Sequence, residues 1–124
     1  MRRCGRCRCP PAWCRFCRRA SGVGFNDGRG LTYSAFGYPA AAPFTGNTLQ
    51  YCSGTATDAP YAQFESQGIP CDMTGGSSGG PRFIGSGSAG YQNSVNSFGY
   101  NNVANTMLVP YWGSVIESAY AAAA

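Results

Sequence analysis

The stretch that decides the fold is Cys71-Asp72-Met73-Thr74-Gly75-Gly76-Ser77-Ser78-Gly79-Gly80-Pro81. Its core of glycine and serine is too flexible for a helix or a regular strand, because glycine reaches backbone angles that other residues avoid. Such a stretch either links two parts of a chain flexibly or holds a reactive group among bare backbone amides. Its flanks favour the second interpretation, since a cysteine and an acid precede it and Pro81–Ile84 follows as the start of a strand.

The hexapeptide Gly76–Pro81 resembles the Gly-Asp-Ser-Gly-Gly-Pro motif of the chymotrypsin-like (trypsin-fold) serine peptidases, with Ser77 in place of the aspartate. The longer string that begins at Cys71 is similar to a secreted bacterial branch of that family, related to the glutamyl endopeptidases. This resemblance implies that Ser78 is the nucleophile. It also implies that the backbone amides of Gly76 and Ser78 form the oxyanion hole.

The composition predicts an all-β fold. The chain has 124 residues, which is enough for one domain, and it is rich in Tyr, Phe and Thr, which favour strands, and in Gly and Asn, which favour tight turns. The resemblance covers residues 21–124. It implies the second six-stranded antiparallel Greek-key barrel of the chymotrypsin-like fold, incomplete, followed by a C-terminal helix over residues 110–121, and so only the C-terminal half of such a peptidase.

The formal charge of +4 belongs to the first nineteen residues, which hold seven of the nine arginines and no acid. Residues 20–124 have five acids against two arginines, a formal charge of −3, so a nucleic-acid partner for this part has no support. No stretch is long and apolar enough for a membrane span, and no 7–15-residue apolar region near the start marks a signal peptide. Secretion is therefore implied by the family resemblance alone.

Residues 1–20 form an Arg/Cys-rich extension with no helical or strand period. Two Cys-x2-Cys pairs can bind zinc through thiolates, but only six residues separate the pairs, which is very tight for a tetrahedral site. The same residue types arise when GC-rich DNA is read in a wrong frame. We expect a disordered or artefactual extension and no metal or other cofactor; a zinc knuckle and a basic nucleic-acid-binding arm remain the alternatives. The pairs are Cys4 with Cys7 and Cys14 with Cys17.

Short β-rich runs between turn residues predict the strands. The segment 53–67 is polar and irregular and is predicted to be a surface loop, and residues 68–71 lead into the central stretch. The expected strands are Leu31–Tyr38, Thr48–Cys52, Pro81–Ile84, Tyr91–Tyr100 and Thr106–Val109.

A helix is predicted to open at Pro110, because proline suits the first helical turn and apolar residues then recur at spacings of three and four. These residues are Trp112, Val115, Ile116, Ala119 and Tyr120.

Two cysteines, Cys52 and Cys71, lie outside the N-terminal extension. Two isolated cysteines in a polar, lysine-free domain suggest one disulfide formed in an oxidising compartment, an expectation that the resemblance supports. The alternative is a pair of buried free thiols.

A second element agrees with a nucleophile at Ser78. The segment Ser97-Phe98-Gly99 begins nineteen residues further on, where the family has a Ser-aromatic-Gly segment. The resemblance implies that its backbone pairs with the substrate as an extra strand and that Gly99 lines the specificity pocket. The alternative is an ordinary strand end.

Asp72 lies six residues before Ser78, at the place of the acid that pairs with a substrate Arg or Lys in the trypsin-like branch. The surrounding loop differs from trypsin, since Cys71 precedes the acid and no cysteine lies between the acid and the serine. Asp72 is therefore either a substrate-binding residue or a loop carboxylate that caps nearby amides.

The chain contains no histidine, so it has no imidazole to act as general base. In the family the catalytic histidine and aspartate belong to the first barrel, outside the region of resemblance. Serine proteases that lose triad members retain only about 10³–10⁴-fold catalysis over water. We therefore predict negligible peptidase activity for the chain by itself, with a polypeptide as the substrate of the intact family member.

Two hypotheses follow. The first is the C-terminal fragment of a secreted serine endopeptidase, whose barrel face toward the missing half is apolar and exposed and promotes self-association. The second is a non-enzymatic β-domain with a Cys-rich zinc- or nucleic-acid-binding arm, which explains residues 1–19 but makes the loop at Ser78 a coincidence.

Overall fold

The computed structural model describes residues 21–61, 65–85 and 90–124, so the predicted extension over residues 1–20 lies outside the described residues. The described ranges contain strands in most of the expected places and a helix at the end of the chain. The elements are β1 (Thr32–Gly37), β2 (Gln50–Thr55), β3 (Thr57–Asp58), β4 (Gln67–Pro70), β5 (Pro81–Ile84), β6 (Gln92–Val95), β7 (Thr106–Val109) and α2 (Ser114–Ala123).

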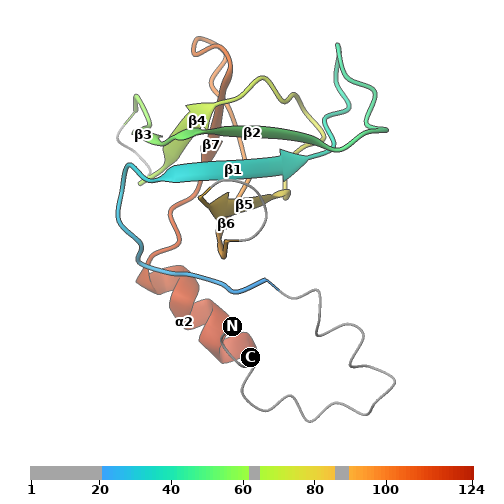
Figure 1. The fold of residues 1–124 in the computed structure, drawn as a ribbon. Helices are drawn as coiled ribbons and strands as arrows, with labels where there is room; N and C mark the ends of the chain where they lie inside the picture. Colours follow the sequence, from blue (N-terminus) through green and yellow to red (C-terminus); the bar gives the residue numbers. More distant parts are fainter. Residues whose placement is uncertain (1–20, 62–64, 86–89) are drawn as a thin grey trace, which may run out of the picture.

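The strands form two antiparallel sheets, in the orders β2-β1-β5-β6 and β3-β4-β7 (Figure 1). This confirms the all-β fold class with a C-terminal helix. Among the described residues the strand ladder stays open between the two sheets and does not close into a single barrel. The sheets pack on each other and enclose a core drawn from both. Its buried members are Tyr33, Ala35, Cys52, Ala56, Ile69, Cys71, Met73 and Met107.

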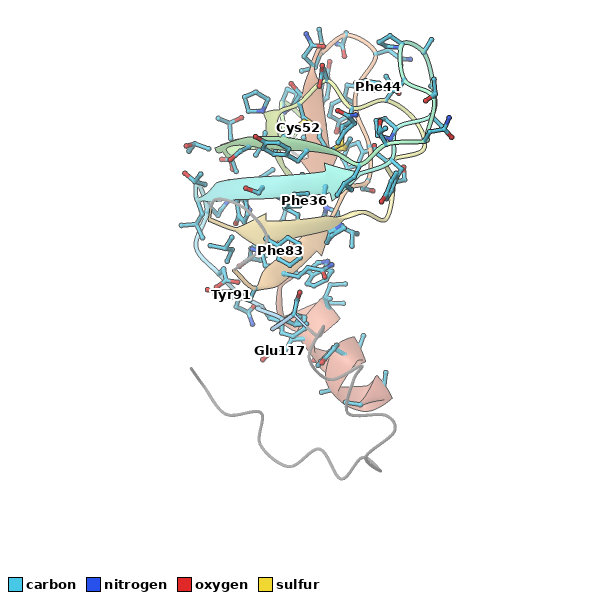
Figure 2. The ribbon with its side chains drawn as sticks, turned by 45° about the vertical axis from the view of Figure 1, so that its right-hand side comes forward. Phe36, Phe44, Cys52, Phe83, Tyr91 and Glu117 are labelled. Atoms are coloured by element: carbon cyan, nitrogen blue, oxygen red, sulfur yellow. A yellow bond between two sulfur atoms is a disulfide. The ribbon has the colours of Figure 1, made fainter. Side chains whose placement is uncertain are left out.

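The disulfide between Cys52 and Cys71 joins the two layers, as expected (Figure 2). Cys52 lies on β2, opposite Ala35 of β1, and Cys71 directly follows β4 of the other sheet. Their Cα atoms are 5.3 Å apart, within the range usual for disulfides. Because Cys71 begins the Gly/Ser stretch, the disulfide also fixes the start of that stretch against the core.

The prediction of a surface loop over residues 53–67 is wrong at both ends. β2 continues to Thr55, β3 follows at once, and β4 begins at Gln67. Residues 68–70, expected only to lead into the central stretch, are the remainder of β4. The strand forms because it pairs on both sides, Gly68 lying opposite Thr57 and Leu108. These partners are distant in sequence, so local composition does not reveal them.

The helix begins at Ser114, later than the predicted start at Pro110, because Gly113 has an extended backbone (φ −88°, ψ −161°). None of the residues of α2 is buried, and Val115 is 79% exposed. Figures 1 and 2 show the helix extending away from the sheets. Within the described ranges, no helix has the length and apolar character needed to cross a membrane.

An N-terminal segment holds the start of α2 in place. The ring of Phe25 stacks on Trp112 at 5.9 Å, and the amide of Asn26 donates to the carbonyl of Trp112 at 2.8 Å. The side-chain amide of Asn26 also donates to a carboxylate oxygen of Glu117 at 2.7 Å. The helix is therefore attached through one short segment and not through a buried face.

Candidate active site

Residues 71–80 connect β4 to β5 and fold back onto the end of β1. The amides of Ala40 and Ala41 both donate to the carbonyl oxygen of Gly75, at 2.8 and 3.0 Å. The hydroxyl of Thr74 donates to the carbonyl of Ala41 at 2.6 Å. These bonds fix the Gly/Ser stretch in one place, so it is not a flexible linker.

Gly76 occupies a position that only glycine fits. Its φ is +101°, and a Cβ built there would lie 2.8 Å from the amide nitrogen of Ala40. The turn exposes the amides of Gly76 and Ser78, and neither donates a hydrogen bond to any group of the described residues. The intervening amide of Ser77 points elsewhere and donates to the carbonyl of Thr74 at 3.3 Å. An oxyanion hole needs amides with no other partner, and this turn supplies two.

The two adjacent serines have different surroundings. Ser77 is 2% exposed, and its hydroxyl donates to the carbonyl of Thr74 at 2.8 Å. Ser78 is exposed, and its hydroxyl lies 3.4 Å from the carbonyl oxygen of Ser97, at the long end of hydrogen bonding. Ser78 is thus the serine whose Oγ a substrate can reach.

Ser78 opens onto a groove of about 370 Å³ with a largely apolar lining. Phe36 and Phe83 pack edge to face at 5.9 Å beneath it, and both are labelled in Figure 2. Two large residues that line the groove are exposed to solvent, Leu49 at 55% and Tyr38 at 53%. The surface beside the serine is therefore apolar and open.

Asn96 holds the serine loop to the sheet and was not singled out from the sequence. It is 1% exposed, and its side-chain amide donates to the carbonyl of Phe36 at 2.9 Å and to that of Ser77 at 3.3 Å. Its backbone amide donates to Gly80 at 2.8 Å, and its carbonyl accepts from the amide of Gly79 at 2.9 Å. One buried asparagine therefore fixes both ends of the turn. In the sequence, the only sign of this role is that Asn96 directly precedes Ser97.

The Ser97–Gly99 segment begins beside Ser78, because the carbonyl oxygen of Ser97 lies 3.4 Å from the Ser78 hydroxyl. Phe98 pairs with Leu108 of β7 through a pair of backbone hydrogen bonds of 3.1 and 2.8 Å. Gly99 is exposed, and its amide and carbonyl have no partner within the described part of the chain. The prediction of a single strand over residues 91–100 is wrong, because β6 ends at Val95 and the backbone of Asn96 then bonds to the serine loop.

Asp72 is exposed and makes no hydrogen bond or ion pair with the described residues. Its neighbours Cys71 and Met73 are both buried, so the alternation of side chains turns Asp72 away from the core. It is not among the residues that line the groove at Ser78. The structure thus brings Ser78, Gly76 and Ser97 together, and it leaves Asp72 on the surface near them in sequence.

The chain contains no histidine, so it offers Ser78 no imidazole base. Among the carboxylates, Asp58 is engaged elsewhere: hydrogen bonds from Gln67 and Arg29 hold its pKa below the ordinary value. Within the described ranges no three His, Cys, Asp or Glu side chains gather closely enough for a metal ion. The cysteine pairs considered for zinc lie outside the described residues.

Comparison with solved structures identifies similar proteins. The chain is 65% identical to a protease (Anisep) from Arthrobacter nicotinovorans, with a TM-score of 0.81, over 85% of this chain and 48% of that one. It is 55% identical to a thermostable serine protease (AL20) from an extremophilic microorganism, with a TM-score of 0.80, over 86% of this chain and 49% of that one. No protein-family model and no curated protein matches the chain.

The chain thus spans about half the length of the proteases that it matches, which is consistent with a C-terminal half. These matches support a serine protease fragment and give no support to a non-enzymatic β-domain with a metal- or nucleic-acid-binding arm. High identity over most of the chain, together with the two-sheet fold, shows that the chain belongs to the chymotrypsin-like serine proteases.

Proposed function

We propose that this chain carries the nucleophile and the oxyanion hole of a secreted serine endopeptidase, and that Ser78 is the nucleophile. The observation that carries the proposal is the exposed Ser78 hydroxyl on a hydrogen-bonded turn. The backbone amides of Gly76 and Ser78 on this turn have no hydrogen-bond partner in the described residues. The similarity to two bacterial proteases supports it.

In the proposed reaction, Ser78 Oγ attacks the carbonyl carbon of a peptide bond. The carbonyl oxygen becomes negatively charged and accepts hydrogen bonds from the amides of Gly76 and Ser78. Because these donors are fixed by the loop before substrate binds, little reorganisation is needed as the charge develops. The serine proton passes to a base that this chain does not contain. From the family resemblance, we expect that base to be a histidine in the N-terminal half of the protease.

The free backbone groups of Gly99 suit pairing with an extended peptide, in the way that exposed strand edges bind substrates and ligands. Ser97 and Phe98 would hold this edge in register through their hydrogen bonds to Leu108. We further propose that Asp72, whose charge has no partner in the described residues, contacts the substrate side chain next to the cleaved bond.

The experiment is reconstitution. The chain is refolded together with the half of the Arthrobacter protease that it does not match. From the resemblance, we expect that half to carry the histidine and the aspartate. Peptide hydrolysis is then measured for the wild type and for Ser78→Ala. We expect hydrolysis by the reconstituted wild type and a loss of at least about 10³-fold in kcat for the variant, with KM nearly unchanged.

Each proposed residue has its own outcome in this assay. An Asp72→Asn variant should weaken cleavage after basic residues more than cleavage after apolar ones if the acid contacts the substrate side chain. A reconstituted one-to-one complex without hydrolysis, or a Ser78→Ala complex with full activity, would contradict the proposal for Ser78.

Secretion belongs to the same proposal. The disulfide between Cys52 and Cys71 supports it, because disulfides persist in oxidising compartments and are rare in the cytosol.

A further inference from the structure

Arg82 is a charged residue inside the fold. It lies in the middle of β5, opposite Ala35 of β1 and Ser94 of β6, and it is 1% exposed. Its guanidinium carbon stacks 3.8 Å from the centre of the Tyr33 ring, which is a favourable cation–π geometry. Burying a positive charge in this way is costly unless a negative group or several hydrogen bonds compensate for it.

The hydrogen bonding of Arg82 is incomplete. Its Nη1 donates to the carbonyl oxygen of Gln67 at 3.2 Å. Its Nε and Nη2 are buried and have no hydrogen-bond partner among the described residues. An unsatisfied buried donor costs about 1–3 kcal/mol, and more when it is charged. The guanidinium therefore presents two strong, unused donor sites.

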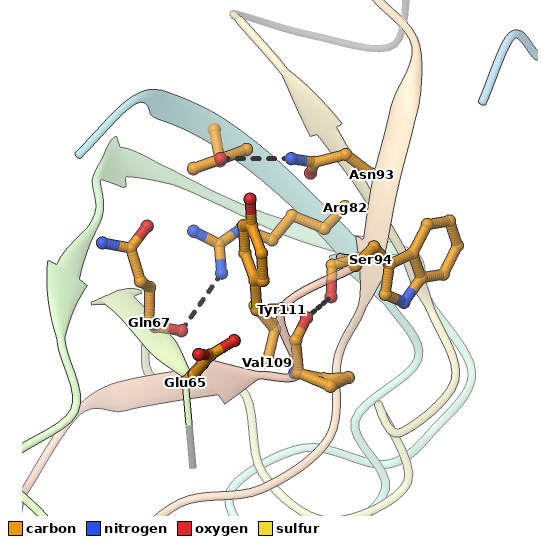
Figure 3. A pocket seen from close by; sticks show the side chains of 10 residues that line it. Glu65, Gln67, Arg82, Asn93, Ser94, Val109 and Tyr111 are labelled. Atoms are coloured by element: carbon orange, nitrogen blue, oxygen red, sulfur yellow. Dashed lines mark hydrogen bonds between the residues drawn. The ribbon is translucent and has the colours of Figure 1, made fainter. Parts of the chain in front are cut away.

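Arg82 lines a cavity of about 20 Å³, shown in Figure 3. Its lining includes Asn93, Tyr111 and Glu65 as well as Arg82. A volume of this size holds one water-sized sphere. The cavity is thus large enough for a single small ligand and too small for a carboxylate-bearing peptide or a phosphate.

A second polar side chain in the cavity lining has one unpaired atom. Asn93 is 8% exposed; its Nδ2 lies 3.1 Å from the hydroxyl of Tyr33, and its Oδ1 is buried and unpaired. The unpaired Asn93 atom is an acceptor, so the unused donors at this cavity are those of Arg82.

No group among the described residues forms an ion pair with Arg82. Burial lowers the pKa of Arg82 to about 10, so the side chain is still protonated at neutral pH. The ion pair found in the described part of the chain is the surface pair of Arg29 with Asp58. Glu65 lines the cavity, but it is exposed and forms no ion pair with Arg82.

We propose that this cavity binds one small monovalent anion of the halide class, held by the Nε and Nη2 groups of Arg82. An anion of this size accepts the unused hydrogen bonds and also neutralises the buried charge. A water molecule would accept the hydrogen bonds but leave the charge. The Glu65 carboxylate would neutralise the charge only by turning in from the surface.

The first test is thermal unfolding of the whole chain at constant ionic strength, with chloride replaced stepwise by gluconate, which is too large for the cavity. Ligand that binds only the folded state raises its stability. We expect the unfolding midpoint to rise by at least about 4 °C between no chloride and saturating chloride. Arg82→Met should abolish this rise, and Arg29→Met, which removes an exposed arginine, should retain it.

The second test locates the ligand and remains valid if the Arg82 variant does not fold. Crystals of the chain soaked in sodium bromide should show an anomalous peak within hydrogen-bonding distance of Arg82 Nε and Nη2. Glu65→Gln should increase bromide occupancy, because it removes a negative charge from the cavity lining. The proposal would be overturned if the unfolding midpoint did not change with chloride concentration. It would also be overturned if the crystals showed a water in the cavity, or the Glu65 carboxylate against Arg82.

Discussion

The hydroxyl of Ser78 lies 3.4 Å from the carbonyl oxygen of Ser97, a residue nineteen positions further along the chain. Neither residue has a buried side chain, so their proximity comes from the backbone around them. Asn96 is the link: it precedes Ser97 and bonds to Gly79, Gly80 and Ser77 around the nucleophile. The position of the proposed nucleophile against the proposed substrate edge therefore depends on the backbone and the side chain of one buried residue.

Replacing Asn96 should loosen this arrangement. Asn96→Ala removes the side-chain donor to the carbonyl of Phe36 and one of two donors to the carbonyl of Ser77, which keeps the amide of Gly80 at 3.1 Å. Losing these bonds in the interior costs about 1–3 kcal/mol. The free energy of unfolding, measured by urea denaturation, should fall by that amount. Asn101→Ala is the matched control, because Asn101 is exposed and surface substitutions usually change stability by less than about 0.5 kcal/mol. Equal losses for the two variants would remove Asn96 from its assigned role.

The two adjacent glycines of the turn should respond differently to alanine. Gly76→Ala forces a side chain into φ +101° and places a Cβ 2.8 Å from the Ala40 nitrogen, so the turn must move. Gly75→Ala meets only the Ala41 side chain, at 3.8 Å. In urea denaturation we expect Gly76→Ala to cost about 1–3 kcal/mol and Gly75→Ala to cost much less. A tolerated Gly76→Ala would contradict the described turn.

The disulfide should contribute substantially to stability. Cys52 and Cys71 are nineteen residues apart, and closing a loop of that size stabilises a fold by about 3 kcal/mol in the chain-entropy model. The double variant Cys52→Ala/Cys71→Ala should lose a similar amount in chemical denaturation. Adding a reductant should destabilise the wild type and leave the double variant unchanged. A reductant-insensitive wild type would show that the two cysteines are not paired in solution.

The apolar surface beside Ser78 should promote self-association. Leu49 lines the groove and is 55% exposed; Tyr51 is 68% exposed and stacks at 5.9 Å on Phe36, which also lines the groove. Sedimentation velocity should show an average mass that rises with protein concentration. Leu49→Ser combined with Tyr51→Thr should shift the distribution toward monomer. A wild type that stays monomeric and melts cooperatively would count against this view of the surface.

The sequence was most informative where the signal is local. The serine turn could be identified because Gly76 and its neighbours must be small for the backbone to turn there, and β5 and β7 were predicted with their observed bounds. The disulfide followed from there being only two cysteines outside the N-terminal extension. These features depend on residues that are adjacent in the chain or few in number.

What the sequence missed depends on distant partners. β4 is recognisable only through its pairing with β3 and β7, and the start of α2 depends on the extended backbone of Gly113. The apolar spacing of α2 predicted a helix correctly but gave no information about burial, since none of its residues is buried. Arg82 and Asn96 are polar residues in the interior, and hydrophobic patterning cannot identify them.

The central claim is that Ser78 is a nucleophile whose base lies outside this chain. Its most direct test is peptide mapping by mass spectrometry after treatment with a fluorophosphonate, which labels activated serines. We predict no labelling of the chain alone, labelling of Ser78 when the chain is reconstituted with the other half of the Arthrobacter protease, and labelling largely retained in Ser77→Ala. Efficient labelling of Ser78 in the isolated chain, or labelling of a different serine in the complex, would contradict the account.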